Sequence, residues 1–396
     1  MKFPRLTIAA PVFNGGATLP RLLDSLLAQT FTDLQVVIID NASTDNTGEV
    51  AAKYQAADSR VHYLRHKTNA GAHISYNEGV HLGLFSDYVA YVGHNDAWAP
   101  QNAERSIEAL EAQPTAVLAY GYVSFTDAEG KNIISQYHDD YEISGDDPGQ
   151  RYITFLEKVN WCTAHYSIMR SEPLRSINPL MIQFNASGDN LLLARLALLG
   201  PFIQLPEQLL FRAMPGATKQ ETFAQRYGRI QIMSQYRNEG IYLPYCRWVK
   251  DHCDAVMMTA LTNQEKNRLC DQTIRILLGR YRGNFITEID RAVDLILKGE
   301  FHKNWEDELE KKPVIQRPGI YKALDFVRLA KLTQELNYAL GLLPQHPGLN
   351  CALGAVYALL GRHEEAKVMF EKELKHNPGF KPAQDYAAQY RKASSG

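Results

Sequence analysis

Four short polar stretches follow apolar segments in the first hundred residues, and each carries side chains that could bind a nucleotide or a cation. They are Pro11-Val12-Phe13-Asn14, Asp40-Asn41-Ala42-Ser43-Thr44-Asp45, Asn69-Ala70-Gly71 and Gly93-His94-Asn95-Asp96. The Phe13 ring could stack on a flat base, and the Asp40 carboxylate could accept a hydrogen bond from a base or a ribose hydroxyl. Gly71 would permit a close backbone approach. Asp96 and Asn95 offer the hard oxygen ligands that Mg²⁺ or Mn²⁺ prefers, and His94 offers a borderline one.

Each stretch also has a plainer interpretation. Phe13 can be a core aromatic beside a turn, and capping by Asx and Ser/Thr residues accounts for Ser43 to Asp45. Capping leaves Asp40 unexplained, because that carboxylate directly follows the apolar run from Val36 to Ile39. For the fourth stretch the alternative is a solvated loop acid. The agreement among the four positions, more than any one of them, indicates a functional site.

A fifth candidate lies further along the chain. Ser187-Gly188-Asp189-Asn190 opens a leucine-rich run that ends at Gly200-Pro201. The run predicts a buried helix, and Asp189 stands where the capping residue of such a helix belongs. Capping is therefore one interpretation of Asp189, and a chemical role is the other.

The segments between these stretches predict the elements that would position them. Apolar, β-prone runs are expected as strands over Leu6–Val12, Gln35–Ile39, Val61–Leu64 and Tyr88–Val92. Segments with helical spacing separate them, the first capped by Thr18 with Pro20 in its first turn. This alternation predicts βαβ units and a mainly parallel sheet. Ligands bind beyond the carboxyl ends of the strands in such sheets, and all four polar stretches lie there.

The second half of the chain predicts helices. Beyond about residue 223 the strand signal fades, and the segment from Lys311 to Gly319 indicates a boundary. After it, a set of residues falls at the spacing of a tetratricopeptide repeat of about 34 residues: Leu353-Gly354, Tyr357, Ala366, Phe370 and Pro378. We therefore expect a first domain over residues 1–222, a helical extension over 223–310 and repeat-like helices over 311–396. The repeats should stack on the preceding helices or on a second chain.

Composition excludes several classes of protein. The chain of 396 residues has 42 Lys plus Arg against 44 Asp plus Glu, and this net charge of -2 gives no electrostatic case for nucleic acid. No apolar run approaches the about 20 residues of a membrane span, and five scattered cysteines make no disulfide framework. The first residues lack the apolar core of a signal peptide, so a cytoplasmic location is expected.

Together, these motifs resemble those of family 2 glycosyltransferases of the GT-A fold. The likeness covers residues 1 to about 220. It is carried by Ala10-Pro11-Val12-Phe13-Asn14-Gly15, Ser25-Leu26-Leu27-Ala28-Gln29-Thr30, Ile39-Asp40-Asn41-Ala42-Ser43-Thr44-Asp45-Asn46-Thr47, Asn69-Ala70-Gly71, Asn77-Glu78-Gly79, Gly93-His94-Asn95-Asp96-Ala97-Trp98-Ala99-Pro100, Gly188-Asp189-Asn190, and Leu205-Pro206-Glu207-Gln208-Leu209 with Arg212. The resemblance implies an α/β fold, a GT-A domain, followed here by an all-α region with tetratricopeptide-like repeats.

The resemblance also implies an activity and its residues. It implies inverting transfer of a sugar from a nucleotide-diphosphate sugar to a hydroxyl of a glycan or protein, with Asp189 as general base. A divalent metal, Mn²⁺ or Mg²⁺, would be held by Asp96 and Asn95 and would neutralise the leaving diphosphate. The repeat region favours a protein acceptor, a protein partner or self-association. The donor would be bound by Pro11, Phe13, Asn14, Asp40, Asn41, Asn69, Gly71, His94, Asn95 and Arg212.

Three positions depart from the family's pattern. Its Asp-x-Asp is here His94-Asn95-Asp96, its acidic pair after the second strand is Asp40-Asn41, and the His that often follows the late Arg is Met214. The altered acidic motif motivates an alternative, a catalytically inactive scaffold that binds protein through the repeat region. A nucleotidyltransferase would be expected to carry a Lys in a Gly-rich loop after the first strand, and residues 14–17 contain none.

Overall fold

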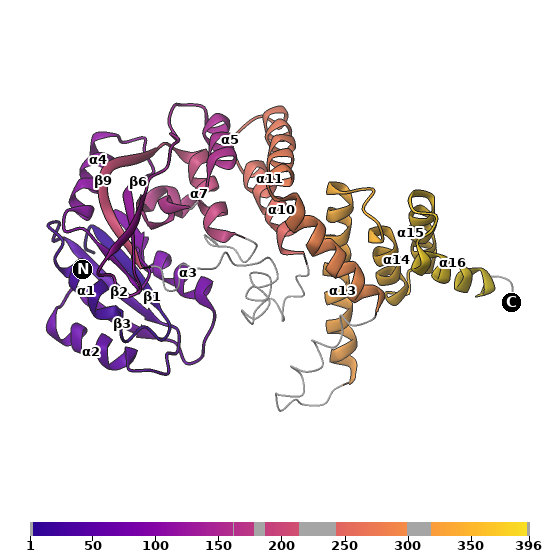
Figure 1. Cartoon of the computed structure of the whole chain (residues 1–396), viewed down its shortest axis with the longest axis horizontal. Coiled ribbons are helices and arrows are strands. Elements are labelled where there is room, and N and C mark those ends of the chain that lie inside the picture. The colour runs from indigo at the N-terminus through magenta and orange to yellow at the C-terminus, as the bar shows by residue number, and fades with distance from the viewer. Residues whose placement is uncertain (1–2, 161, 178–186, 214–242, 299–317, 394–396) are drawn as a thin grey trace. The chain divides into compact units, whose positions relative to one another are not determined.

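The computed structural model describes residues 3–160, 162–177, 187–213, 243–298 and 318–393. It divides into two compact units, each described here by itself. Unit 1 comprises residues 1–220 and 252–273, and unit 2 comprises residues 221–251 and 274–396. Unit 1 is built on a β-sheet with helices, and the described part of unit 2 is helical (Figure 1). The finer division expected from the sequence, with boundaries near residues 222 and 310, stays a prediction.

The first four strands form the parallel sheet that the sequence predicts. β1 (Leu6–Val12) lies between β2 (Leu34–Asp40) and β4 (Tyr88–Tyr91), and β3 (Val61–Arg65) pairs with β2. The register places Val12 opposite Asp40 and Asp40 opposite Arg65. The carboxyl ends of β1, β2 and β3 therefore lie at one edge of the sheet, where the polar stretches were expected.

The rest of the sheet is mixed, a feature that the prediction of a mainly parallel sheet did not include. The strand order is β3-β2-β1-β4-β8-β6-β9-β5, with β7 paired to β6. β8 is antiparallel to β4, β5 is antiparallel to β9, and β9 is parallel to β6. The additional strands are β5 (Asp96–Trp98), β6 (Leu118–Thr126), β7 (Ile133–Tyr137), β8 (Ile168–Arg170) and β9 (Phe202–Ala213).

Helices cover both faces of the sheet, because alternate side chains of each strand point to opposite faces. On one face, Ile8 and Ala10 of β1 belong to a core shared with α1, α2 and α4. On the other face, Ala9 meets Gly79 of α3, where a Cβ on the glycine would lie only 2.4 Å from the Ala9 Cβ. The helices of this part are α1 (Leu19–Leu27), α2 (Thr47–Ala57), α3 (Ala72–Gly83) and α4 (Asn102–Ala112).

The remaining elements of unit 1 complete the side of the sheet that carries β8 and β9. They are α5 (Pro148–Lys158), the short 3₁₀ helix η1 (Thr163–Tyr166), α6 (Ser171–Ser176) and α7 (Gly188–Leu199). The leucine-rich run forms α7, and its residues from 190 to 198 are buried. The buried helix predicted there is confirmed.

Two buried glutamates close helix ends in unit 2. Glu288 accepts hydrogen bonds from the backbone N–H groups of Tyr245 and Cys246, and Glu373 accepts them from Gly348 and Cys351. Each carboxylate thus satisfies donors that a helix N-terminus leaves without partners. The helices are α10 (Pro244–Met257), α11 (Asn263–Leu297), α13 (Pro318–Leu342), α14 (Leu349–Leu359), α15 (His363–His376) and α16 (Lys381–Ala393), and α10 and α11 also contribute to unit 1.

The residues with repeat-like spacing lie on α14 and α15 and in the turn after them. Gly354 faces Phe370, and a Cβ on the glycine would lie 2.7 Å from that ring. The Phe370 ring stacks on Tyr386 of α16 with centroids 4.7 Å apart. Neighbouring helices therefore pack through the residues that set the repeat spacing, while a tetratricopeptide identity stays a prediction. Of the boundary segment expected from Lys311 to Gly319, residues 311–317 lie outside the described residues, and Pro318 and Gly319 begin α13.

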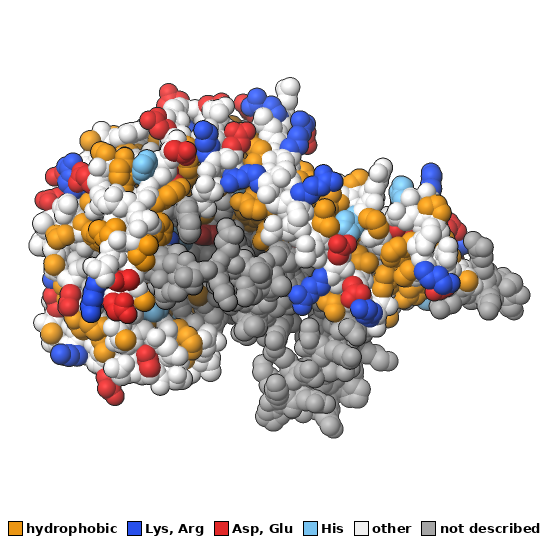
Figure 2. Space-filling view, viewed as in Figure 1, with side chains coloured by type: hydrophobic (Ala, Val, Ile, Leu, Met, Phe, Trp, Pro, Cys, Tyr) orange, Lys and Arg blue, Asp and Glu red, His pale blue; other side chains and the backbone are white. Residues whose placement is uncertain are grey.

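Acidic and basic side chains are interspersed over the visible face of unit 1 (Figure 2). This mixture agrees with the nearly balanced charge of the chain. None of the helices in the described ranges combines the length and the apolar character needed to cross a membrane.

Candidate active site

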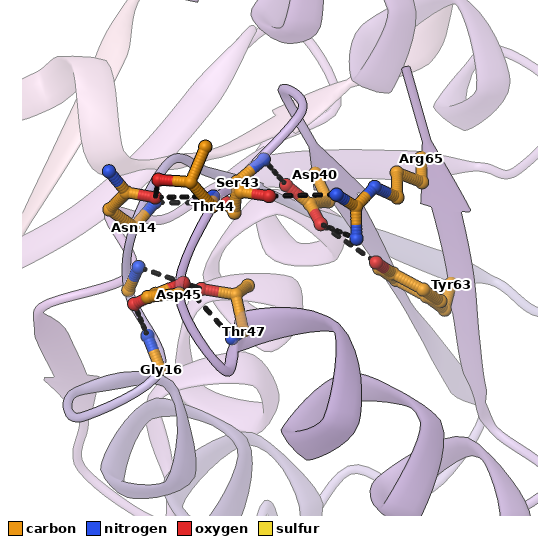
Figure 3. A network of polar contacts seen from close by, with 10 residues as sticks. Asn14, Gly16, Asp40, Ser43, Thr44, Asp45, Thr47, Tyr63 and Arg65 are labelled. Carbon is orange, nitrogen blue, oxygen red and sulfur yellow. Dashed lines mark hydrogen bonds and ion pairs between the residues drawn. The ribbon is translucent and has the colours of Figure 1, made fainter. Parts of the chain in front are cut away.

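Asp40, the last residue of β2, is fully buried at the edge where the parallel strands end. Its Oδ1 accepts a hydrogen bond from the Ser43 N–H at 2.8 Å, and its Oδ2 accepts one from the Tyr63 hydroxyl at 2.7 Å (Figure 3). The Arg65 guanidinium lies 3.9 Å from Oδ2. A buried carboxylate needs such partners, because its desolvation is costly. Asp40 therefore organises the loop that follows β2.

The loops after β1 and β2 are joined by hydrogen bonds (Figure 3). The Asn14 N–H donates to Ser43 Oγ at 2.9 Å, and Asn14 Oδ1 accepts from the Thr44 N–H at 2.8 Å. The Gly16 N–H donates to Asp45 Oδ2 at 3.0 Å. Asn14 adopts a left-handed backbone with φ of 52° at the junction. These bonds fix the loops as one rigid rim.

Two predicted donor-binding residues on this rim differ in exposure. Pro11 is buried inside β1, whereas Phe13, just beyond the strand, is 44% exposed. An exposed ring at the end of a parallel strand is available for stacking on a flat ligand. Of these two residues, Phe13 has the exposed side chain that could contact a ligand.

The third polar stretch is tied to the second through Asn41. The Asn41 Nδ2 donates to Asn69 Oδ1 at 2.9 Å, and Asn41 Oδ1 accepts from the Ala70 N–H at 2.8 Å. His66 Nδ1 lies 3.1 Å from the same Asn41 oxygen, and His66 Nε2 lies 2.6 Å from Glu78 Oε2. Asn41 and Asn69, two of the residues predicted to bind the donor, thus lie together.

A cleft of about 690 Å³ borders this group. It is lined by His66, Lys67, Thr68, Ala70, Ile74, Asn77, Glu78, His81, Leu82 and Phe85. The sequence analysis did not assign His66 to the site, because its partner Glu78 lies 12 residues away on α3. Only the fold brings these two side chains together.

The fourth stretch lies beside the end of β9. Asp96 pairs with Arg212 in the antiparallel register of β5 and β9, and Arg212 Nε is 3.8 Å from Asp96 Oδ2. Burial raises the pKa of Asp96 to about 6, against opposing effects of Arg212, the Ala213 backbone and Arg21. Asn95 Nδ2 donates to the Ala213 carbonyl at 3.1 Å. The predicted metal ligands are thus bonded to the protein's own groups.

His94 faces the first loop instead of the predicted metal position. Its Nδ1 lies 2.9 Å from the Thr18 hydroxyl. Burial lowers the pKa of His94, although the Asp45 carboxylate opposes the shift. The imidazole is therefore neutral near neutral pH and links the fourth stretch to the start of α1.

Arg212 is held by an aromatic ring as well as by a carboxylate. Its guanidinium lies over Tyr166 of η1, 4.4 Å from the ring centroid, and its Nη2 donates to the Tyr166 hydroxyl at 3.1 Å. Burial works against the charged form, but Tyr166, Asp96, Tyr76 and Asp189 keep the pKa of Arg212 above its usual value. Arg212 therefore carries a fixed positive charge that interacts electrostatically with both Asp96 and Asp189.

Asp189 lies in the first turn of α7, two residues beyond the N-cap position that the sequence assigns to it. Ser187 is the residue at the N-cap. Asp189 Oδ1 accepts hydrogen bonds from the Ser187 hydroxyl at 2.7 Å and from the Asn190 N–H at 2.8 Å. The interpretation of Asp189 as the capping residue is thus corrected, since the chain enters the helix two residues earlier.

His165 of η1 lies close to Asp189 and Arg212. Its ring stacks on Tyr91 with centroids 4.8 Å apart, and its buried Nδ1 has no hydrogen-bond partner in the described chain. Burial lowers the pKa of His165 to about 4, with Asp189 opposing and Arg212 adding to the shift. His165 is thus neutral at neutral pH.

Asp139 is a buried carboxylate that the sequence analysis missed. It accepts hydrogen bonds from the hydroxyls of Tyr120 (2.8 Å), Thr163 (3.0 Å) and Tyr137 (3.0 Å). Thr163 begins η1, so Asp139 anchors the turn that carries His165 and Tyr166. No local pattern marks this residue, because its partners come from β6, β7 and η1.

The residues of the fourth stretch do not fit a divalent cation as the chain folds. The described ranges contain no cluster of three or more His, Cys, Asp or Glu side chains placed to hold a metal. Asp96 is 2% exposed and faces Arg212, and the Asn95 amide is committed to Ala213. Met214, which replaces the family's His, lies outside the described residues. Binding of Mn²⁺ or Mg²⁺ by Asp96 and Asn95 stays a prediction.

The first part of the chain is similar to a known family of proteins. Residues 7–177 match the model of the family Glycosyl transferase family 2. Glycosyltransferase GlyA of Streptococcus pneumoniae serotype 4 is 30% identical over 127 residues, covering 32% of this chain and 18% of that protein. The uncharacterized glycosyltransferase YibD of Escherichia coli K12 is 36% identical over 96 residues, covering 24% and 27%. The matches span less than half the length of these relatives.

Solved structures show the same fold. The crystal structure of S. aureus TarS 1-349 in complex with UDP has a TM-score of 0.51 at 14% identity, over 98% of this chain and 92% of that one. The same TarS fragment in complex with UDP-GlcNAc has a TM-score of 0.51 at 12% identity, over 94% and 92%. The predicted fold class, a GT-A domain followed by a helical region, is confirmed.

Proposed function

From the premise that residues 7–177 form a domain of glycosyl transferase family 2, we propose that this chain is an inverting glycosyltransferase. It transfers a sugar from a nucleotide-diphosphate sugar to a hydroxyl of a glycan or protein. Asp189 is the general base. The observation that carries the proposal is that Arg212, whose Nε lies 3.8 Å from Asp96 Oδ2, also interacts electrostatically with Asp189, so a cationic group suited to a leaving diphosphate lies near the proposed base.

The donor binds along the edge formed by the ends of β1, β2 and β3. Phe13 stacks on the base, and the loops at Asn14, Asn41, Asn69 and Gly71 hold the ribose and diphosphate. Support comes from the hydrogen bonds that fix these loops to one another before any ligand arrives. A preorganised site loses less free energy in ordering side chains when it binds.

Asp40 has a supporting role in this scheme. Its two oxygens are occupied by Ser43 and Tyr63, so it shapes the loop that meets the donor. His94 and Asn95 act in the same way on the other side of the first loop, through Thr18 and Ala213.

The reaction is a displacement at the anomeric carbon. The acceptor oxygen forms a bond to that carbon on the face opposite the diphosphate, and the carbon–oxygen bond to the diphosphate breaks with its electron pair on the diphosphate oxygen. The acceptor proton passes to the Asp189 carboxylate, which is held toward this role by Ser187 and the Asn190 N–H. Positioned base catalysis of this kind contributes about 10²–10⁴-fold to the rate.

A panel of nucleotide-diphosphate sugars tests the proposal. In one experiment, the melting temperature of the full chain is measured with each compound. In a second, at constant temperature, the release of free nucleoside diphosphate from each compound is followed. A ligand at about 100 times its dissociation constant adds about 2.7 kcal/mol to stability, so one nucleotide should raise the melting temperature clearly. The same nucleotide sugar should release nucleoside diphosphate slowly when water accepts the sugar, and faster when an acceptor hydroxyl is present.

The alternative function, a catalytically inactive scaffold, predicts a different result in the same experiment. No nucleotide sugar would raise the melting temperature or release diphosphate, while a transferase of known activity would respond in parallel. The full chain would then be used to search for a protein that binds the repeat-like helices of unit 2.

A further inference from the structure

Two guanidinium groups from neighbouring elements lie beside the loop that would hold a cation. Asp96 is its one carboxylate, and two guanidinium groups, Arg21 and Arg212, act on it. Arg21 Nη2 donates a hydrogen bond to the Asn95 carbonyl, and Arg212 Nε lies 3.8 Å from Asp96 Oδ2. Asn95 supplies an amide where a carboxylate would add a negative charge. A cation bound at Asp96 would therefore share that carboxylate with two guanidinium groups already beside it.

A divalent ion at Asp96 would meet direct repulsion. Mg²⁺ binds carboxylate oxygen at about 2.0–2.1 Å, so an ion on Asp96 Oδ2 would lie within about 6 Å of the Arg212 guanidinium. That guanidinium cannot lose its proton, and its place is fixed by Tyr166. Like charges at this distance in a buried site repel strongly.

Arg212 instead has the geometry of an anion-binding group. Its Nε is buried and makes no hydrogen bond within the described chain. An arginine fork recognises phosphate oxygens with parallel hydrogen bonds, and stacking on an aromatic ring leaves the edge of the fork free. Tyr166 therefore holds the Arg212 guanidinium in a fixed position while Nε still lacks a hydrogen-bond acceptor in the described part of the chain, and a phosphate oxygen would supply one.

We propose that Arg212, assisted by Arg21, neutralises the leaving diphosphate of the donor in place of a divalent cation. This inference rests on the proposed function. When the bond between the anomeric carbon and the diphosphate oxygen breaks, the electron pair stays on that oxygen. The guanidinium N–H groups stabilise the added negative charge by hydrogen bonds that strengthen as the charge develops.

The test compares nucleotide binding with and without metal. The full chain is stripped with EDTA, and UDP, GDP, ADP and CDP are titrated by calorimetry in EDTA and in MnCl₂. For the nucleotide that binds, the two dissociation constants should agree within about threefold, which is a small difference in binding free energy. Release of diphosphate from the matching nucleotide sugar should likewise persist in EDTA.

Variants assign the effect to Arg212. Arg212→Gln should weaken binding of the nucleoside diphosphate by about 10- to 100-fold, as expected for a lost hydrogen bond to a charged group, and MnCl₂ should not restore it. The nucleoside monophosphate should be affected less, so the preference for diphosphate falls. Arg105→Gln removes an exposed arginine that is paired with Glu207 and should change nothing. Melting curves of both variants show whether a loss of binding is caused by a loss of fold. An Arg212→Lys variant keeps the positive charge and shows whether the guanidinium group itself is needed.

The outcomes distinguish the two proposals. Binding or diphosphate release that occurs in MnCl₂ and disappears in EDTA would overturn the arginine mechanism and leave the transferase function standing. An Arg212→Gln protein that folds and binds nucleoside diphosphate as tightly as the parent would overturn it as well. Absence of binding by every nucleotide in both buffers would overturn the proposed function and this inference together.

Discussion

The residues of the candidate site divide into those that meet a ligand and those that hold other residues in place. Phe13, Arg212 and Asp189 belong to the first kind in our account. Asp40, Asn95 and His94 belong to the second, because their polar atoms are bonded to Ser43 and Tyr63, to Ala213 and to Thr18. The residue types alone could not separate the two kinds, since an acid at a strand end looks the same in both.

The first prediction concerns the Tyr166 hydroxyl, which helps to hold the Arg212 guanidinium in position. Tyr166→Phe keeps the ring below the guanidinium and removes the hydroxyl that accepts from Nη2. A typical hydrogen bond contributes about 0.5–1.5 kcal/mol, so we expect nucleoside diphosphate to bind about 2- to 10-fold more weakly in calorimetry. Tyr54→Phe removes a hydroxyl bonded to Asp24 on α1 and serves as the matched control. Equal affinities for the two variants would contradict the role given to the hydroxyl.

Asp139 gives a prediction about stability. Asp139→Asn deprives at least one of the three hydroxyl donors of its acceptor in a buried site. We expect a loss of about 1–3 kcal/mol in the free energy of unfolding, measured with urea. Asp140→Asn, at the exposed neighbouring position, should change it by less than about 0.5 kcal/mol. If the two variants are equally stable, Asp139 does not anchor η1.

At the scale of elements, the sequence predicted what local periodicity encodes. The strands predicted over Leu6–Val12 and Gln35–Ile39 and the buried helix opened by Ser187-Gly188-Asp189-Asn190 are confirmed, because each has a continuous apolar run. The order beyond β4 was not predictable in the same way. β8 has three residues and β5 has three, and such short strands are specified by their partners rather than by their own composition.

The contact between α3 and β1 gives a prediction for elements. Gly79→Ala would place a Cβ 2.4 Å from the Ala9 Cβ, so α3 must move away from the sheet. We expect a loss of about 1–3 kcal/mol in thermal or urea unfolding, as for other overpacked cores. Gly279→Ala lies in α11 with nothing within 4 Å of the added atom, and it should stabilise by up to about 1 kcal/mol. Destabilisation by the second variant alone would refute this account.

For the whole molecule, the sequence indicated a sheet-based first part and a helical second part, and the two units agree with that division in kind. The buried glutamates of unit 2 were not foreseen. Glu288 lies 42 residues from Cys246, whose N–H it accepts, and no sequence period relates the two. Contacts of this sort depend on how helices meet, which local patterns do not specify.

Glu288 gives a prediction for the pH dependence of unit 2. Burial raises the pKa of Glu288 to about 8, although the N–H groups of Tyr245 and Cys246 oppose the shift. The folded state therefore holds the proton more tightly than the unfolded state, and stability is greatest below the ordinary glutamate pKa. It falls as pH rises from about 4.5 toward about 8.

Melting curves check this effect. The parent should lose melting temperature between pH 5 and pH 8, at about 2–4 °C for each kcal/mol lost. Glu288→Gln removes the titrating proton and should flatten that part of the profile. Glu364→Gln, at an exposed position in the first turn of α15, should leave the profile of the parent unchanged. A parent that is more stable at pH 8 than at pH 5 would contradict the prediction.

The central claim is that Asp189 removes the acceptor proton in a site that binds a nucleotide-diphosphate sugar. The most direct test is the rate of sugar transfer, or of diphosphate release to water, for the parent and for Asp189→Asn at saturating donor. We predict a rate lower by about 10²–10⁴-fold with the dissociation constant of the donor changed by less than about threefold. A variant that binds the donor and turns it over as fast as the parent would contradict the account.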